Sequence, residues 1–148
     1  MPEQLDPLAE ATGRVVIAAG RLEGAVGVLV GYALGDRSGR VMPGSLEALI
    51  RWWGDHIDRE SDAHARARHE AARAEAIQLG RERDELIHGF WTAAANQVAQ
   101  SNRVPTKASE LALAQRTISE LRQLASRIDA HADAVLALAI QIVHGEQS

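Results

Sequence analysis

Apolar residues recur with helical spacing in several segments of the chain, most regularly over residues 106–144. The large positions and the alanines between them fall on a seven-residue repeat: Leu111, Ile118, Leu121, Ile128, Val135 and Ile142, with Ala114, Ala125, Ala132 and Ala139. This repeat predicts one long helix, from about Thr106 to His144, that Gly145 ends. Its apolar seam would pack into a bundle and is long enough to pack on a partner chain as well.

The first helix is expected from Leu8 to Leu34, before the loop "GDRSGRVMPGS", which concentrates turn residues. Glycines recur through it at Gly20, Gly24, Gly27, Gly31 and Gly35. Each glycine inside a helix costs up to about 1 kcal/mol relative to alanine, so close packing against another helix must offset the loss. A ligand groove along the glycines is the alternative interpretation.

A second helix is predicted from the N-cap Ser45 to about Glu60. Its apolar face consists of Leu46, Leu49, Ile50, Trp53 and Ile57. Trp52 and Trp53 point about 100° apart on a helix, so only one of them can be central to the core. The other is expected at a protein interface, with base stacking as the alternative.

The third helix is expected after a break at Ser61 and Asp62 and extends to about Asn96. The break lies inside "DRESDAHARARHEAARAE", residues 58–75, a charged run with alanine spacers, so we expect His64 and His69 to face water. The segment "NQVAQSNRVPT" then separates it from the last helix. Together these patterns predict an all-α fold: a single domain over residues 1–148, formed by an up-down bundle of four to five helices.

Composition supports packed helices, because aromatic residues make up only 3% of the chain and hydrophobic residues 46%. Cysteine is absent, which excludes disulfides, thiolate nucleophiles and zinc-cysteine sites and suits a reducing cytoplasm. The acidic N-terminus does not resemble a secretory signal. Residues 15–34 are largely apolar, but Arg21 and Glu23 lie within them, so we expect no membrane span.

The formal net charge of −4 argues against a general polyanion binder, so any contact with RNA must be local. The sequence contains no glycine-rich phosphate loop, serine triad or HExxH motif, and no cofactor is expected. Any catalytic or binding site must therefore be formed by another cluster of polar residues.

Such a cluster is "RERDELIHGFW", residues 81–91. Asp84 and His88 are four residues apart and share a helix face, so the carboxylate can orient the imidazole. Leu86 and Ile87 can face the core. Arg83 lies about 140° from His88 around the axis, so the two side chains converge only over a shared cleft, through a loosened helix, or with the help of a second protomer.

An arginine and a histidine beside a carboxylate suit metal-free cleavage of a phosphodiester. Imidazole, with an unperturbed pKa of about 6.5, can deprotonate a ribose 2′-hydroxyl or protonate the leaving oxygen. Arginine can stabilise the charge that develops on phosphorus. Because RNA itself supplies the attacking group, DNA would be inert.

In these residues the chain resembles the HEPN domain family, whose hallmark is an arginine followed after four to six residues by histidine. Here the motif is Arg83-Asp-Glu-Leu-Ile-His88, and the following Gly89 and Trp91 resemble the ending of many members. The resemblance implies a helical bundle and a homodimer in which two Arg-His pairs form a metal-independent endoribonuclease site. It also implies a role as a toxin or in phage defence, where a toxin has an antitoxin partner.

The spacing alone is a weak signal, because chance predicts about two such pairs in this composition. Arg51 to His56 has the same spacing, and Arg81 reaches His88 with six residues between them. Which of Arg81 and Arg83 binds phosphate is left open. Glu-x-x-His, a quarter of a di-iron motif, occurs once here without a second copy. The alternative function is a catalytically silent helical dimer that binds another protein.

Overall fold

The described part of the chain forms four α-helices in the computed structural model. They are α1 (Pro2–Ala33), α2 (Leu46–Arg59), α3 (Ala63–Ser101) and α4 (Lys107–Gln147). The structure describes the backbone of residues 2–36, 42, 44–101 and 107–147, and the side chains of 7–36, 42, 44–89, 92 and 115–145. Since no strand occurs within those residues, the expectation of an all-α helical bundle is confirmed.

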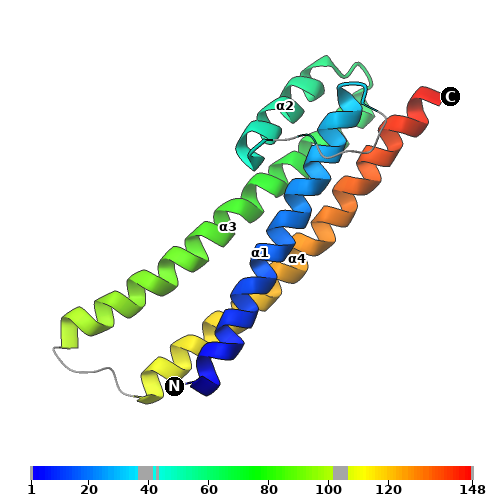
Figure 1. Ribbon diagram of the computed structural model, residues 1–148. Coiled ribbons are helices and arrows are strands. Elements are labelled where there is room, and N and C mark those ends of the chain that lie inside the picture. Colours follow the sequence, from blue (N-terminus) through cyan, green and yellow to red (C-terminus); the bar gives the residue numbers. More distant parts are fainter. Residues whose placement is uncertain (1, 37–41, 43, 102–106, 148) are drawn as a thin grey trace.

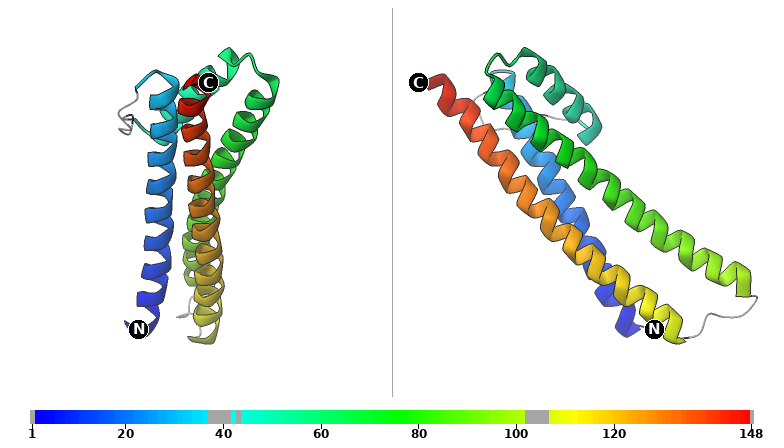
Figure 2. Two further views of the ribbon diagram at one scale, coloured as in Figure 1. Left: turned by 90° about the vertical axis from the view of Figure 1, so that its right-hand side faces the viewer. Right: turned by 180° about the vertical axis from the view of Figure 1, so that it is seen from behind.

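The axes of the three long helices point roughly along a common direction, and the short α2 packs at one end of the bundle (Figure 1). α1 and α4 run parallel, and α3 runs in the opposite direction, so that the long helices alternate up, down and up. The last part of α3 diverges from α1 and α4 (Figure 2). The motif of residues 81–91 lies on α3 before this end.

The core is built mainly along the seam between α1 and α4. Its α1 members recur every three or four residues: Ala11, Val15, Ala18, Leu22, Ala25, Val26, Leu29 and Val30. Its α4 members are Leu121, Leu124, Ala125, Ile128, Ala132, Val135 and Ala139. The small alanines allow the helices to approach closely, while each buried leucine, isoleucine or valine contributes about 1.5–3 kcal/mol. The seven-residue repeat therefore marks the buried seam as predicted, although Leu111 and Ala114 lie outside the described side chains.

α2 closes the end of this core. The Oγ atom of Ser45 accepts a hydrogen bond from the amide of Ala48 at 3.2 Å, which confirms the predicted N-cap. The predicted apolar face is also confirmed, with Leu49, Ile50, Trp53 and Ile57 buried and Leu46 partly buried. Trp53 is fully buried and Trp52 is 40% exposed, so only one of the adjacent tryptophans is central to the core.

α1 ends in a glycine cap. Gly35 has a φ of +94°, and the amides of Gly35 and Asp36 donate to the carbonyls of Tyr32 and Gly31 at 3.1 and 2.9 Å. This pair of bonds satisfies carbonyls that the end of the helix leaves open. Gly145 does not act in this way: α4 continues through it, so the prediction that Gly145 ends the helix is wrong. A glycine ends a helix only where the chain adopts a positive φ.

Two other helices extend beyond their predicted boundaries. α1 begins at Pro2 rather than Leu8 and contains Pro7, and α3 extends to Ser101 rather than Asn96. Pro2 takes the first helical position, where an amide would lack an intrahelical partner anyway. Pro7 lies further in, and α1 continues through it although its ring nitrogen cannot donate a hydrogen bond. The break between α2 and α3 lies where it was predicted.

The glycines of α1 fall into two groups. Gly27 and Gly31 are buried, in agreement with close packing. Gly20 and Gly24 are not: a Cβ atom added to either would meet no heavy atom within 4 Å. For these two positions the prediction of close packing within the chain is wrong, because they lie on the side of α1 that turns away from α4.

Replacing Gly20 with alanine is therefore expected to stabilise the chain by about 0.5–1 kcal/mol, since the helix gains propensity without a clash. Gly54→Ala is the comparison, because its Cβ would lie 3.1 Å from Nη2 of Arg73, and it should gain less or lose. Urea denaturation of both variants measures the difference. A loss of stability at Gly20 would contradict an open face and indicate that something outside the chain packs there.

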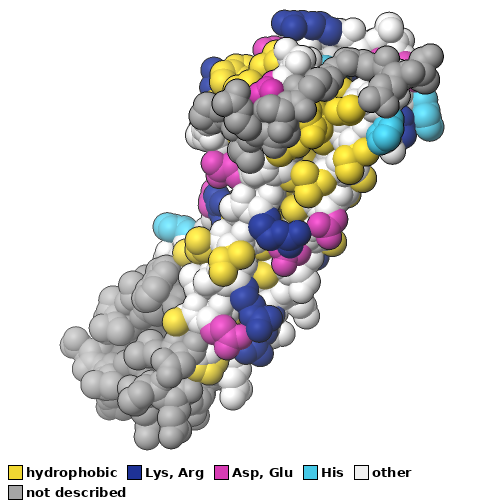
Figure 3. Space-filling view, turned by 45° about the vertical axis from the view of Figure 1, so that its right-hand side comes forward, with side chains coloured by type: hydrophobic (Ala, Val, Ile, Leu, Met, Phe, Trp, Pro, Cys, Tyr) yellow, Lys and Arg dark blue, Asp and Glu magenta, His cyan; other side chains and the backbone are white. Residues whose placement is uncertain are grey.

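Several large apolar side chains remain on the surface: Val16, Ile17, Leu34, Trp52, Leu136 and Ile140. Figure 3 shows hydrophobic side chains on one face of the molecule, with charged side chains among them. Arg21 forms ion pairs with Asp129 at 2.6 Å and Asp133 at 3.1 Å, which join α1 to α4. Residues Pro7–Ala33 of α1 are long and apolar enough to cross a membrane, but half of that window is buried inside the bundle. The buried half of this apolar segment belongs to the core, while Val16 and Ile17 are exposed.

Candidate functional site

The motif "RERDELIHGFW" lies on one continuous stretch of α3, with an apolar side and a polar side. Leu86 and Ile87 are partly buried and pack against the core, as the sequence predicts. The side chain of His88 is exposed, directly after this anchored pair. The helical period therefore directs the imidazole away from the core and into solvent. The side chains of Phe90 and Trp91 lie outside the described residues.

The arginine and the carboxylate of the motif bind each other. Nε and Nη2 of Arg83 lie 3.1 and 3.0 Å from Oδ1 of Asp84. The imidazole Nε2 of His88 lies 3.4 Å from the hydroxyl of Thr92, one turn further along α3. The structure thus joins Asp84 to Arg83 and does not join it to His88, although the spacing permits that contact. An exposed carboxylate beside a guanidinium gains more from this charged neighbour than from a neutral imidazole.

Arg81 stands in a different relation to His88. The two are seven residues apart, which on a helix places them on the same face, separated by about 10 Å along the axis. Arg81 is exposed and forms no ion pair with another described residue. Arg83 is about 140° away around the axis. By helix geometry alone Arg81 is the arginine that shares the face of His88, while Arg83 is the one that Asp84 binds.

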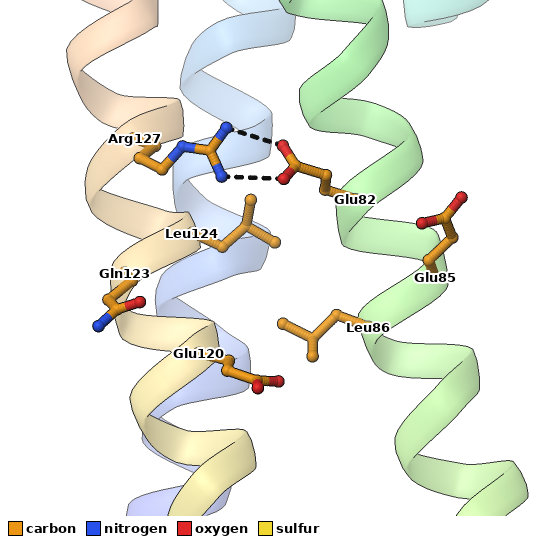
Figure 4. Close-up of a pocket in the computed structure, with 7 residues that line it drawn as sticks. All are labelled: Glu82, Glu85, Leu86, Glu120, Gln123, Leu124 and Arg127. Carbon is orange, nitrogen blue, oxygen red and sulfur yellow. Dashed lines mark hydrogen bonds and ion pairs between the residues drawn. The ribbon is translucent and has the colours of Figure 1, made fainter.

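A cleft of about 390 Å³ lies between α3 and α4 beside the motif (Figure 4). It is lined by Glu82, Glu85, Leu86, Glu120, Gln123, Leu124 and Arg127. Leu86 and Leu124 point toward each other across it, and Glu120 projects from α4 toward α3. Its walls therefore combine an apolar middle with acidic margins.

Arg127 of α4 closes the upper part of this cleft. It donates to both carboxylate oxygens of Glu82, at 3.0 and 2.8 Å, and it also lies 3.8 Å from Glu75. The hydrogen bonds that Arg127 donates to Glu82 raise the pKa of Arg127 further above its usual value, so this side chain stays charged. With one arginine against the carboxylates of Glu82, Glu85 and Glu120, the cleft itself repels phosphate. A nucleic acid would have to approach His88 from the solvent-facing side of α3.

A second cluster of polar residues was missed by the sequence interpretation. His64 is exposed as expected, but His69 is buried, with 5% of its surface exposed, so the prediction that it faces water is wrong. α2 covers this part of α3, and Nε1 of Trp53 donates to Nδ1 of His69 at 3.0 Å. The charged residues around His69 are typical of a solvent-exposed helix. Local composition could not predict its burial, because that burial depends on a neighbouring helix.

Within the described residues, no three histidine, aspartate or glutamate side chains come together in a way that could hold a metal ion. Glu85 and His88, which spell Glu-x-x-His, are both exposed on α3. No family model, no curated protein sequence and no solved structure matches the chain. Its function has to be argued from its own residues.

Proposed function

We propose that the chain is a metal-independent endoribonuclease of HEPN type that acts as a homodimer in the cytoplasm. His88 is the general acid and base, Arg83 binds the scissile phosphate, and Asp84, which binds Arg83, orients the site. The observation that carries the proposal is the exposure of His88 immediately after the anchored pair Leu86 and Ile87. The packing of Leu86 and Ile87 fixes this part of the helix, and the imidazole of His88 is exposed. His88 can therefore reach a substrate without rearrangement of the helix.

The chemistry follows from these side chains. The imidazole removes the proton of a ribose 2′-hydroxyl, whose oxygen attacks the adjacent phosphorus while the bond to the leaving 5′-oxygen breaks. A guanidinium stabilises the negative charge on the phosphoryl oxygens in the transition state. The products are a 2′,3′-cyclic phosphate and a 5′-hydroxyl. Because α3 is straight, one copy of the motif does not bring Arg83 and His88 to one atom, and a second copy across a twofold axis supplies the missing half.

The acidic neighbours of the motif restrict how RNA can bind. Glu82 is turned toward α4 and neutralised by Arg127, and the charge of Asp84 is offset by Arg83. Arg81 remains available on the face of His88. These pairings reduce the repulsion that three carboxylates within residues 82–85 would exert on phosphate. The proposal therefore requires contact with a few nucleotides rather than a long basic groove.

Cleavage is tested with purified protein and with single-stranded and structured RNA in EDTA. The expected result is cutting that leaves 2′,3′-cyclic phosphate ends, with DNA of the same sequence intact. Absence of cutting, or products with 3′-hydroxyl ends, would contradict the proposal. Expression in a bacterial host gives a second measurement, since a toxin should slow growth when it is expressed without an antitoxin protein.

A catalytically silent helical dimer that binds a protein partner is the second candidate. The acidic cleft of Glu82, Glu85 and Glu120 supports it, because a cleft with an apolar middle and acidic margins suits a basic segment of a protein better than a phosphate. Growth distinguishes the two candidates: an interaction module should be harmless both as wild type and as Arg83→Ala. Restoration of growth by Arg83→Ala would favour the nuclease.

A further inference from the structure

The contact between α2 and α3 contains a pair of histidines, the buried His69 and the partly buried His56. Trp53 of α2 is fully buried, and its indole donates to Nδ1 of His69 on α3 at 3.0 Å. His56 of α2 packs edge to face on His69, with ring centroids 5.3 Å apart and an angle of 74° between the rings. These three side chains are here called the His-Trp clasp. They have no part in the proposed nuclease motif.

The hydrogen bond fixes the protonation state of His69. Because Nδ1 accepts from the indole, it carries no proton, and the neutral ring has its proton on Nε2. An added proton would go to Nδ1, where it would face the N–H of Trp53. Two donors would then point at each other, and the buried ring would carry a charge beside a second imidazole.

The second histidine, His56, offers no hydrogen bond through its Nε2 atom that would offset the cost of protonating His69. Nε2 of His56 is buried and has no hydrogen-bond partner among the described atoms. A cavity of about 370 Å³ adjoins the two rings and is lined by His56, Glu60, Asp62, Ala65, Arg68, His69, Gln141, Ile142 and Gly145. This opening gives water a route to the clasp once it loosens.

Charged groups from the neighbouring elements face the clasp. Asp55 and Arg59 of α2 line a second cavity together with His56. On the side of His69, the C-cap contributes Glu60, the turn contributes Asp62, α3 contributes Arg68, and α4 contributes the uncharged Gln141. Burial is the main cause that lowers the pKa of His69 below 6.5, followed by the nearby His56, while Glu60 opposes the shift and Arg68 adds to it. The surroundings therefore favour the neutral ring.

We infer that the His-Trp clasp is a pH-sensitive device: uptake of a proton by His69 breaks its bond to Trp53 and loosens α2 from α3. Two other bonds near the clasp run from arginines of α3 to main-chain carbonyls and involve no histidine. Nε of Arg73 donates to the carbonyl of Ile50 at 2.8 Å, and Arg66 donates to the carbonyl of Glu60. These bonds lie on either side of Trp53, so the middle of α2 is the part that is released.

The direction of the pH dependence follows from linkage. The pKa of His69 is lower in the folded chain than in the unfolded chain, so the stabilisation by the clasp is complete above about pH 6.5 and is lost as the pH falls below that value. Between the two pKa values, the population with a loosened α2 rises by up to about tenfold for each pH unit. Above this range the population is constant.

Hydrogen exchange of the Trp53 indole and of the α2 amides tests the inference. After correction for intrinsic exchange, protection should fall between pH 7.5 and pH 5.5 in the wild type. It should stay constant in His69→Gln, whose amide oxygen can accept from Trp53 without titrating. The matched control is His64→Gln, an exposed histidine five residues earlier, which should behave as wild type.

Two results would overturn the inference. One is an equal fall of protection in His69→Gln and in the wild type. The other uses the wild-type chain alone and applies even if His69→Gln does not fold: NMR titration of the His69 ring with an ordinary midpoint near pH 6.5, like that expected of an exposed histidine, would show that the clasp does not resist protonation.

Discussion

Replacing His88 with alanine is expected to lower the rate of RNA cleavage by about 10²–10⁴-fold, the contribution typical of a positioned general acid or base. Since the His88 side chain is exposed and its contact is with the exposed Thr92, the substitution should leave stability nearly unchanged. Initial rates on a short RNA, together with urea denaturation of the same preparations, measure both effects.

The matched control for His88 is His64→Ala, because His64 is also exposed on α3 but lies far from the motif in the sequence. It should cut at the wild-type rate. Equal cutting by His88→Ala and the wild type would end the nuclease proposal. Arg83→Ala and Arg81→Ala then identify the arginine that binds phosphate: we expect the larger loss at Arg83, and a larger loss at Arg81 would assign that role to the arginine that shares the face of His88.

Trp53→Ala is expected to have the largest effect on stability, a loss of about 3–5 kcal/mol. The fully buried indole fills the space between α2 and the end of the core, and its N–H satisfies the buried Nδ1 of His69. Its removal leaves a cavity and an unpaired acceptor at once. Urea denaturation at pH 7.5, where His69 is neutral in either state of the clasp, measures the loss.

Trp52→Ala provides the comparison within the same helix turn. Its side chain is 40% exposed and contributes less to the core, so the loss should be well below that at Trp53, at roughly 1 kcal/mol. Losses of the same size at both positions would contradict the assignment of Trp53 as the anchor of α2. A helix propensity effect cannot explain the difference, because both substitutions replace tryptophan with alanine.

The two proposals concern different parts of α3. The nuclease proposal concerns the polar face of α3 around His88, and the clasp concerns its first turns around His69. His88→Ala should leave the pH dependence of α2 protection unchanged, and His69→Gln should leave RNA cleavage at pH 7.5 unchanged. The two proposals can therefore be tested independently, and a negative result for one does not contradict the other.

Much of the fold could be predicted because helices are specified locally. The seven-residue repeat of α4, the Ser45 cap and the face that includes Ile50 and Trp53 each depend on residues within one or two turns, where the period of 3.6 residues fixes which side chains share a face. The motif around His88 is of the same kind, since each residue is turned by about 100° from the one before, which places His88 nearly opposite Leu86 whatever packs against the helix. For this reason the packing of Leu86 and Ile87 against the core could be predicted.

The contacts between elements were decided by tertiary structure. The pairing of Arg127 with Glu82 joins residues 45 positions apart, and nothing local in either segment indicates it. Likewise His69 lies in a run of charges and alanines that is typical of a solvated helix, yet α2 folds over it and buries it. Gly20 and Gly31 both belong to the glycine series of α1, but only Gly31 is covered. Local periodicity determines the face on which a side chain lies, and only the packing of distant helices determines what covers that face, because the free energy of burial depends on the neighbour as well as on the residue.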